Sequence, residues 1–311
     1  MTRNTAFQER FSRSFRRLLS GAPDGTPPWL DVVARGDQVG YFLPTDAPWV
    51  IHRDFGTLVG GIRALLMQAL HPAALAGVRD HSRYETDPLG RLAGTIRWLT
   101  VTTFASTPEV LREAERVNRL HKHVTGKFDT GDGDVRPYRA ADPEFLLWVH
   151  VAFMESFLVA HQLYAGAPIP PGRASSGADN YVAQWAASVT PLGLDAAPTT
   201  VSEVDAIIDD LRDRGVLTSS ESTRLVVNFI RRPPLPILAR PIYRLLFDAA
   251  VVSIRPEFRT MLGLRAKPRW LIVGATRLTL RLMRAAVGPE SPIEDAALAR
   301  LERIGAWPTS S

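Results

Sequence analysis

The sequence contains no cysteine among its 311 residues. This absence excludes disulfide bonds, thiolate metal sites and cysteine nucleophiles. Any metal ion must therefore be held by histidine, carboxylate or neutral ligands. A chain without cysteine also suits a reducing compartment, and we predict a cytoplasmic protein.

The chain also lacks several segments and motifs that would assign it to a class. No continuous apolar run reaches the roughly 18 to 20 residues that a transmembrane helix needs. The first 21 residues carry arginines without the apolar stretch of a secretory signal, and their spacing predicts a short leading helix. No HExxH, GxGxxG, GxxxxGK[ST] or GxSxG motif is present, so no zincin-type metal site, nucleotide site or serine hydrolase is indicated.

Positive charge is in excess but is not concentrated in a long basic run. The formal net charge is +5, and the arginines are interleaved with acidic residues. Because no recognition motif accompanies this charge, we expect no nucleic-acid partner.

Apolar residues recur mainly at helical spacing. From Asp54, the residues Leu58, Ile62 and Leu66 follow one stripe of a helix that is apolar almost all round, which is typical of a buried helix. Few segments alternate as strands do, and residues 126–137 are polar and glycine-rich, which predicts a loop. We therefore predict an all-α protein, with helices near 54–69, 72–78, 91–104, 109–125, 143–164, 179–189, 202–214 and 270–287.

The predicted organisation is a single large helical domain with three parts. Residues 1–50 form an N-terminal helix and an irregular connecting segment, residues 51–265 form the helical body, and residues 266–311 form C-terminal helices that pack on the same domain. The helix at 270–287 carries Arg277, Arg281 and Arg284 on an apolar background. This pattern favours packing on the body and leaves a peripheral membrane contact open.

Histidines are the candidate ligands, and four of the seven lie at positions 71, 81, 121 and 123. His121 falls on the inward face of the helix at 109–125, whereas His123 points elsewhere, so His121 is a candidate metal ligand. His71 precedes a proline beside an apolar helix, and His150 lies inside one. Histidines in such places are more often structural than ligating, and both readings stay open.

Arg91 and Thr95 are placed at i and i+4 on one predicted helix. An arginine beside a buried cavity needs an anion, and a carboxylate is its natural bidentate partner. A structural salt bridge and the carboxylate of a bound cofactor would both meet that need.

Four ordered motifs carry a family resemblance: RALLMQALHPAALAGVRDHS, DPLGRLAGT, HKHVTG and YRAADPEFLLWVH. Together they resemble the rubber-oxygenase (latex-clearing-protein) family, which includes the fungal oxygenase of mycophenolic acid biosynthesis. The resemblance covers roughly residues 50–265. It implies a mostly helical domain with a globin-like core that binds haem b, and an oxygenase that acts with dioxygen or peroxide on a hydrophobic small molecule.

The resemblance also implies roles for particular residues. The iron-ligating histidine of the family matches His121, and the arginine and threonine beside the haem match Arg91 and Thr95, which makes these two the catalytic and cofactor-binding candidates. Rubber-cleaving members have a lysine directly before that threonine, whereas this chain has Gly94. The lysine-closed distal site is therefore not expected here.

Two other readings remain open from the sequence. One is a non-haem iron oxygenase in which His71, His121 and His150 form the ligand triad. The other is a non-catalytic protein that binds haem or lipid, for which Gly94 is the main support. The substrate, the electron donor and the oligomeric state do not follow from the sequence.

Overall fold

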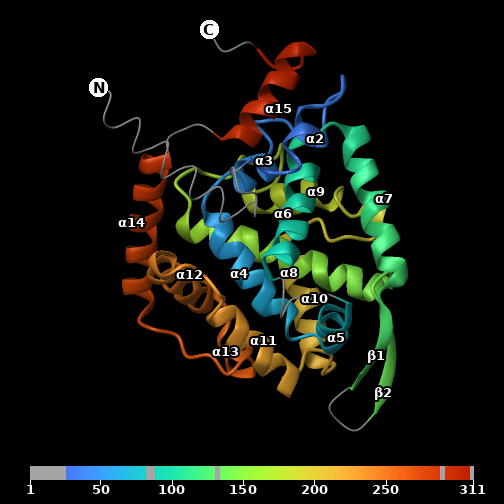
Figure 1. Cartoon of the computed structure of the whole chain (residues 1–311), viewed down its shortest axis with the longest axis vertical. Helices are drawn as coiled ribbons and strands as arrows, with labels where there is room; N and C mark the ends of the chain where they lie inside the picture. Colours follow the sequence, from blue (N-terminus) through green and yellow to red (C-terminus); the bar gives the residue numbers. More distant parts are fainter. Residues whose placement is uncertain (1–25, 82–87, 130–133, 288–290, 309–311) are drawn as a thin grey trace.

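The computed structural model describes residues 26–81, 88–129, 134–287 and 291–308. Its described part is built from helices and one small two-stranded sheet, which confirms the all-α prediction (Figure 1). The predicted leading helix lies outside the described residues. In chain order the elements are α2 (Leu30–Ala34), α3 (Ala47–His52), α4 (Gly56–Gln68), α5 (Pro72–His81), α6 (Pro88–Phe104), α7 (Thr107–His123), β1 (Thr125–Asp129), β2 (Val135–Arg139), α8 (Pro143–Tyr164), α9 (Gly177–Ala186), η1 (Thr190–Leu192), α10 (Val201–Asp213), α11 (Glu221–Arg231), η2 (Ile237–Ala239), α12 (Arg240–Ser253), α13 (Pro256–Met261), α14 (Arg269–Val287) and α15 (Pro292–Arg303).

Many helices begin at a proline or at a side-chain cap. Proline occupies the first turn of α7, α8, α12, α13 and α15, where its missing N–H costs no hydrogen bond. In α10, Thr200 and Glu203 form a reciprocal capping box. Helix α7 begins slightly earlier than predicted, since Ser106 is its N-cap residue and Thr107 is its first helical residue.

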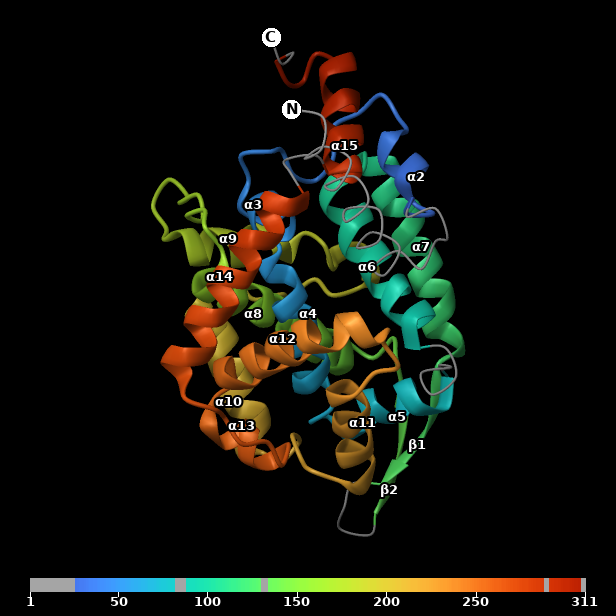
Figure 2. The ribbon, with the colours of Figure 1, turned by 60° about the vertical axis from the view of Figure 1, so that its left-hand side comes forward.

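Helices α4 and α8 form the central pair of the fold (Figures 1 and 2). Gly60 makes their close approach feasible, since a Cβ there would lie 2.6 Å from Cδ1 of Phe157. The buried residues Val59, Leu66 and Met154 share one large apolar cluster, to which α9, α10, α11, α12 and α14 also contribute. Burial of this apolar area is the main force that holds the domain together.

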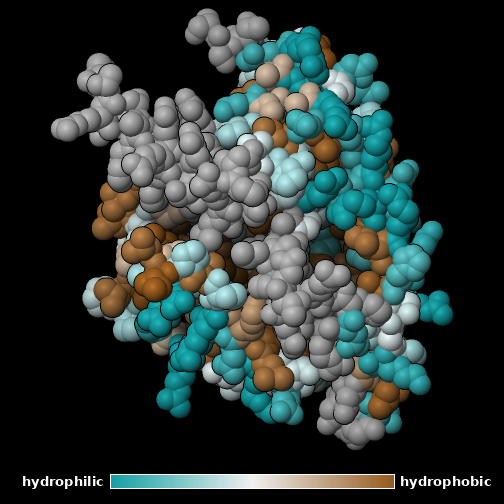
Figure 3. Space-filling model, viewed as in Figure 1, coloured by the Kyte–Doolittle hydropathy of each residue, from teal (hydrophilic) through white to brown (hydrophobic). Residues whose placement is uncertain are grey.

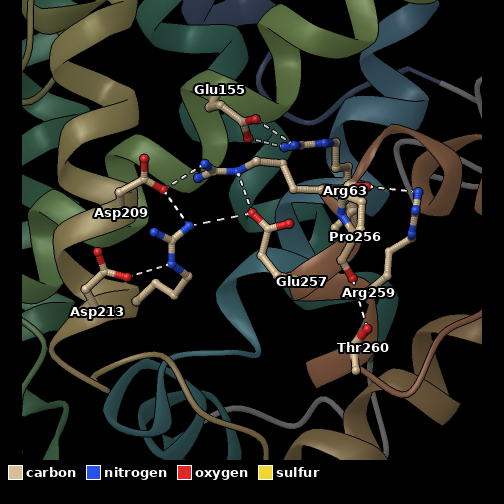
Figure 4. A network of polar contacts seen from close by, with 11 residues as sticks. Arg63, Glu155, Asp209, Asp213, Pro256, Glu257, Arg259 and Thr260 are labelled. Carbon is tan, nitrogen blue, oxygen red and sulfur yellow. Dashed lines mark hydrogen bonds and ion pairs between the residues drawn. The ribbon is translucent and has the colours of Figure 1, made fainter.

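A buried ion pair fixes the register of this central pair. Arg63 of α4 is 1% exposed and donates from both terminal nitrogens to the carboxylate of Glu155 on α8, and also to Oγ of Ser156. Figure 4 shows this pair beside a more exposed group of ions in which Asp209 and Glu257 meet arginines of α10 and of the segment before α13. The buried arginine therefore has its counter-ion within the core, as a buried charge requires.

A second, smaller apolar cluster joins the two ends of the chain. Leu301 and Ala297 of α15 pack with Val33 of α2 and with Val101 and Phe104 of α6. The predicted helices end at Val287, so α15 has no individual counterpart among them. It lies within the C-terminal part that was expected to pack on the domain.

The polar segment at 126–137 is not a simple loop, and this part of the prediction was wrong. Strands β1 and β2 pair antiparallel, and Gly126 lies opposite Tyr138. The ring of Tyr138 is buried against Ala73 and Ala76 of α5, so a packing partner outside the segment stabilises the hairpin. A Cβ at Gly126 would lie 2.8 Å from the Tyr138 hydroxyl, which explains the glycine there.

By length and composition alone, α8 is the described helix that could cross a membrane, although the sequence analysis had found no run long enough. Core helices of globular domains pass the same test. Because α8 packs against α4, α9 and α14 and contains the buried groups His150 and Ser156, we interpret it as the core helix of this domain.

Candidate functional site

Helices α6 and α7 form an antiparallel hairpin along one side of the molecule (Figures 1 and 2). Glu113 of α7 is 2% exposed and accepts hydrogen bonds from Arg97 of α6 (2.9 Å) and from Arg116 of its own helix. Burial alone would raise the pKa of the Glu113 carboxyl, but the two arginines outweigh it and lower that pKa. The carboxylate therefore stays charged and holds the hairpin together.

The hairpin brings the start of α6 beside the last turns of α7, because the two helices run in opposite directions. His121 lies in the last turn of α7 and is half-buried, while His123 is exposed, as the sequence predicted. Burial lowers the pKa of His121, so its ring is neutral near pH 7. Its Nδ1 atom is buried and has no hydrogen-bond partner in the described part of the chain.

Arg91 and Thr95 both belong to α6, so their predicted helical spacing of four residues is confirmed. Thr95 is half-buried, whereas the side chain of Arg91 lies outside the described residues. Gly94 is exposed, and a Cβ at this position would meet nothing within 4 Å. The position that differs from the resembled pattern therefore has open space around it.

His71 lies between α4 and α5 and is 2% exposed. Its Nδ1 atom accepts the backbone N–H of Ala74 at 3.5 Å, and burial lowers its pKa to about 4. A neutral ring whose Nδ1 accepts must carry its proton on Nε2. That Nε2 atom is buried and has no partner among the described residues.

A second unused donor lies beside His71. The ring of Trp148 on α8 is 6.3 Å from the His71 ring, and its buried Nε1 has no acceptor in the described structure either. A buried donor without an acceptor costs roughly 1 to 3 kcal/mol, so each of these N–H groups favours an oxygen atom of a bound molecule. Helix α5, which follows His71, contacts the residues that follow α7, with Gly77 next to Val124.

His150 on α8 is 4% exposed, and burial lowers its pKa to about 4. Its Nε2 atom is also buried without a partner among the described residues. However, no three histidines or carboxylates of the described residues lie close enough to hold a metal ion. The triad of His71, His121 and His150 is therefore not assembled, and this alternative prediction was wrong.

Sequence reasoning missed His52, which is the histidine with the most complete hydrogen bonding. The hydroxyl of Thr103 donates to the carbonyl of Leu99, so it accepts from Nδ1 of His52 at 2.8 Å. Nε2 then accepts the hydroxyl of Tyr181 at 2.9 Å. Both nitrogens are used in joining α3, α6 and α9, so His52 is structural, in contrast to His71, His121 and His150. The flanking Trp49 and Ile51 were the only hint of its burial.

Among the described side chains, His161 in the last turn of α8 is a further buried histidine. Its Nε2 donates to the carbonyl of Ala167 at 2.9 Å, and its Nδ1 has no partner among the described residues. Nδ1 of His161 is therefore a hydrogen-bond acceptor without a donor. A buried acceptor without a partner costs less free energy than a buried donor without one.

Comparison with known proteins gives one finding. The chain matches, over residues 49–287, the family described as ER-bound oxygenase mpaB/B'/rubber oxygenase, catalytic domain. No curated protein and no solved structure matches the chain. The family match covers most of α3 and all of α4 to α14, and it includes the hairpin, His121 and both unused donors. The chain therefore belongs to the mpaB/rubber oxygenase catalytic-domain family, and it is an oxygenase that acts on a small molecule with an oxygen-derived co-substrate.

Proposed function

We propose that the protein is a haem-b-dependent oxygenase of a hydrophobic small molecule, in which His121 would bind the iron. The observation that carries this proposal is the buried, neutral and unpartnered nitrogen of His121. A haem iron bound to histidine requires a neutral imidazole with a free nitrogen. The residues present therefore fit the group, although the second-sphere acceptor that usually orients such a ring is absent from the described residues.

Other residues of the hairpin would complete the site. Arg91 lies at the start of α6, where its guanidinium would offset the charge of a haem propionate. Thr95 would add a hydroxyl one turn further along. When bound, the haem would supply the iron at which dioxygen or peroxide is activated. The apolar residues of α4 and α8 would exclude water and position the substrate.

The unused donors of His71 and Trp148 add a second function to the site. Both N–H groups are fixed by packing, and the Phe145 ring lies 5.1 Å from the His71 ring. They would bind an oxygen atom of the substrate, of its product or of the cofactor. This contribution orients the bound molecule rather than activating it.

The direct test is to replace His121 and to measure haem retention. We expect His121→Ala to lose the Soret band and to keep less than about a tenth of the wild-type haem after gel filtration, because the bond from His121 to the iron would be the main specific anchor. His123→Ala is the matched control, since His123 is exposed and lies two residues further on the same helix. Full occupancy with an unchanged spectrum in His121→Ala would contradict the assignment.

A second candidate is a haem- or lipid-binding protein without turnover, which Gly94 favours because no side chain at that position can close the site. Oxygen consumption by the haem-loaded protein with apolar substrates distinguishes the two. Normal haem binding with no oxygen- or peroxide-dependent turnover would favour the binding protein.

A further inference from the structure

Exposed apolar side chains line the outer side of α14 and the short helix η2, both of which pack on α12. They belong to Trp270, Leu271, Leu278 and Leu282 of α14 together with Ile237 and Leu238 of η2, and we name this surface the α14–η2 face. Leu238 is 91% exposed and Trp270 is 79% exposed. Figure 3 shows the apolar side chains of this region at the left edge, over α14 and the start of α12. Large apolar side chains gathered in this way mark an interaction surface.

The fold does not need this face for its own packing. Helix α14 buries a different side, on which Ile272, Leu280 and Met283 pack against α12 and α8. The exposed residues Leu271, Leu278 and Leu282 are spaced by seven and then four residues, which places them together on the opposite side. The helix is therefore apolar on two sides, and one of them has no partner in the described structure.

The segment that contains the face is strongly positively charged. Residues 231–287 contain twelve of the 37 basic residues of the chain but two of its 32 acidic residues, so this segment carries +10 and the rest of the chain −5. Both acidic residues are already paired, Asp248 with Lys267 at 2.7 Å and Glu257 with Arg212 and Arg255 at 3.7 Å. The exposed arginines near the leucines, such as Arg269 and Arg281, have no carboxylate partner among the described residues.

We propose that the α14–η2 face docks on the surface of an anionic lipid bilayer. Leucines and a tryptophan flanked by arginines are the composition of a helix that lies in the membrane interface, where the apolar side enters the acyl region and the cations meet lipid phosphates. A second copy of the chain is a poorer occupant, because the unpaired arginines of two such faces would repel each other. The proposal does not depend on haem.

Vesicle flotation of the full chain tests this proposal. We expect binding to vesicles of 30% phosphatidylserine and 70% phosphatidylcholine, and about tenfold weaker binding to phosphatidylcholine alone or in 1 M salt, because the cations contribute much of the attraction. The double variant Leu278→Asp/Leu282→Asp should bind at least about tenfold more weakly. Arg281→Glu should weaken binding to the anionic vesicles and leave the weak binding to neutral vesicles unchanged.

Val135→Asp is the matched control, because Val135 on β2 and Leu282 have the same exposure of 62%. This variant should bind as the wild type does, and circular dichroism should show that all variants are folded. Emission of Trp270 should shift to the blue on binding, as shown by comparison with Trp270→Phe. Unchanged binding of the double variant would overturn the proposal, as would a dimer in solution that the double variant abolishes.

Discussion

At the scale of single residues, the hydrogen bonds of each buried histidine separate structural groups from candidate ligands. Both nitrogens of His52 are used, and their direction follows from the hydroxyl of Thr103, which donates to a backbone carbonyl. His71 and His150 are equally buried, yet each has a nitrogen without a partner in the described structure. Burial alone would not have distinguished them.

These three histidines make stability depend on pH. Burial lowers the pKa to about 3 for His52 and to about 4 for His71 and His150, below the ordinary value of 6.5. As the pH falls below 6.5, these histidines bind protons in the unfolded chain but stay neutral in the folded chain. Stability is therefore complete above about pH 6.5 and is lost between there and about pH 4, by roughly 1.4 kcal/mol per pH unit for each histidine.

Urea unfolding of the apoprotein at pH 7 and at pH 5 measures this loss. His150→Gln should reduce the difference in unfolding free energy between pH 7 and pH 5 by the contribution of one histidine. His123→Gln should leave this difference unchanged, because His123 is exposed. Most carboxylates titrate below this window, so they add little to it. Equal stability at both pH values would contradict the assignment of neutral buried rings.

At the scale of elements, the packing of α4 on α8 depends on one of two adjacent glycines. A Cβ at Gly60 would lie 2.6 Å from Cδ1 of Phe157 and 3.1 Å from its Cα, while a Cβ at Gly61 would meet nothing within 4 Å. Gly60→Ala should therefore destabilise the protein by about 1 to 3 kcal/mol through overpacking. Gly61→Ala should stabilise it by about 0.5 to 1 kcal/mol through helix propensity.

Thermal unfolding of the two variants side by side decides this prediction, because they share the same chemical change. A lower Tm for Gly60→Ala and a higher Tm for Gly61→Ala are expected. If both variants melt at the same temperature, the two helices do not approach closely at Gly60.

At the scale of the whole molecule, α15 anchors the hairpin of the candidate site to the N-terminal part. Arg300 is 1% exposed and donates to the carbonyl of Phe104 at 3.0 Å, while Glu294 accepts from Trp49 at 2.9 Å. Helix α15 lies outside the residues 49–287 that match the family.

Replacing a buried leucine of α15 tests this anchoring. Leu301→Ala should cost about 2 to 5 kcal/mol of unfolding free energy, because Leu301 is fully buried among Val33, Val101 and Phe104. Leu298→Ala, on a half-buried position of the same helix, should cost clearly less. Urea unfolding compares the two, and an equal loss in both variants would argue against the anchoring.

Helices could be predicted from the sequence because their signals are local. Pro72, Pro108 and Pro143 mark helix starts, and the period of apolar residues placed His121 inward and His123 outward. The resemblance then supplied a role for His121, which the family match supports only at the level of an oxygenase domain.

Features that depend on contacts distant in sequence could not be predicted. The ion pair of Arg63 and Glu155 joins positions 92 residues apart, and the chain of bonds through His52 reaches Tyr181. The β1–β2 hairpin looked polar because its one buried ring, Tyr138, rests on α5 rather than within the hairpin. In each case the stabilising partner lies outside the local pattern.

The central position of α8 has a consequence for biosynthesis. Its partners α12 and α14 are encoded about 100 residues later, so the nascent chain exposes this apolar helix before the segments that cover it have been made. During that interval α4 is the main element available to shield it. The order of synthesis thus leaves α8 accessible to chaperones until residue 287 has left the ribosome and the core can close.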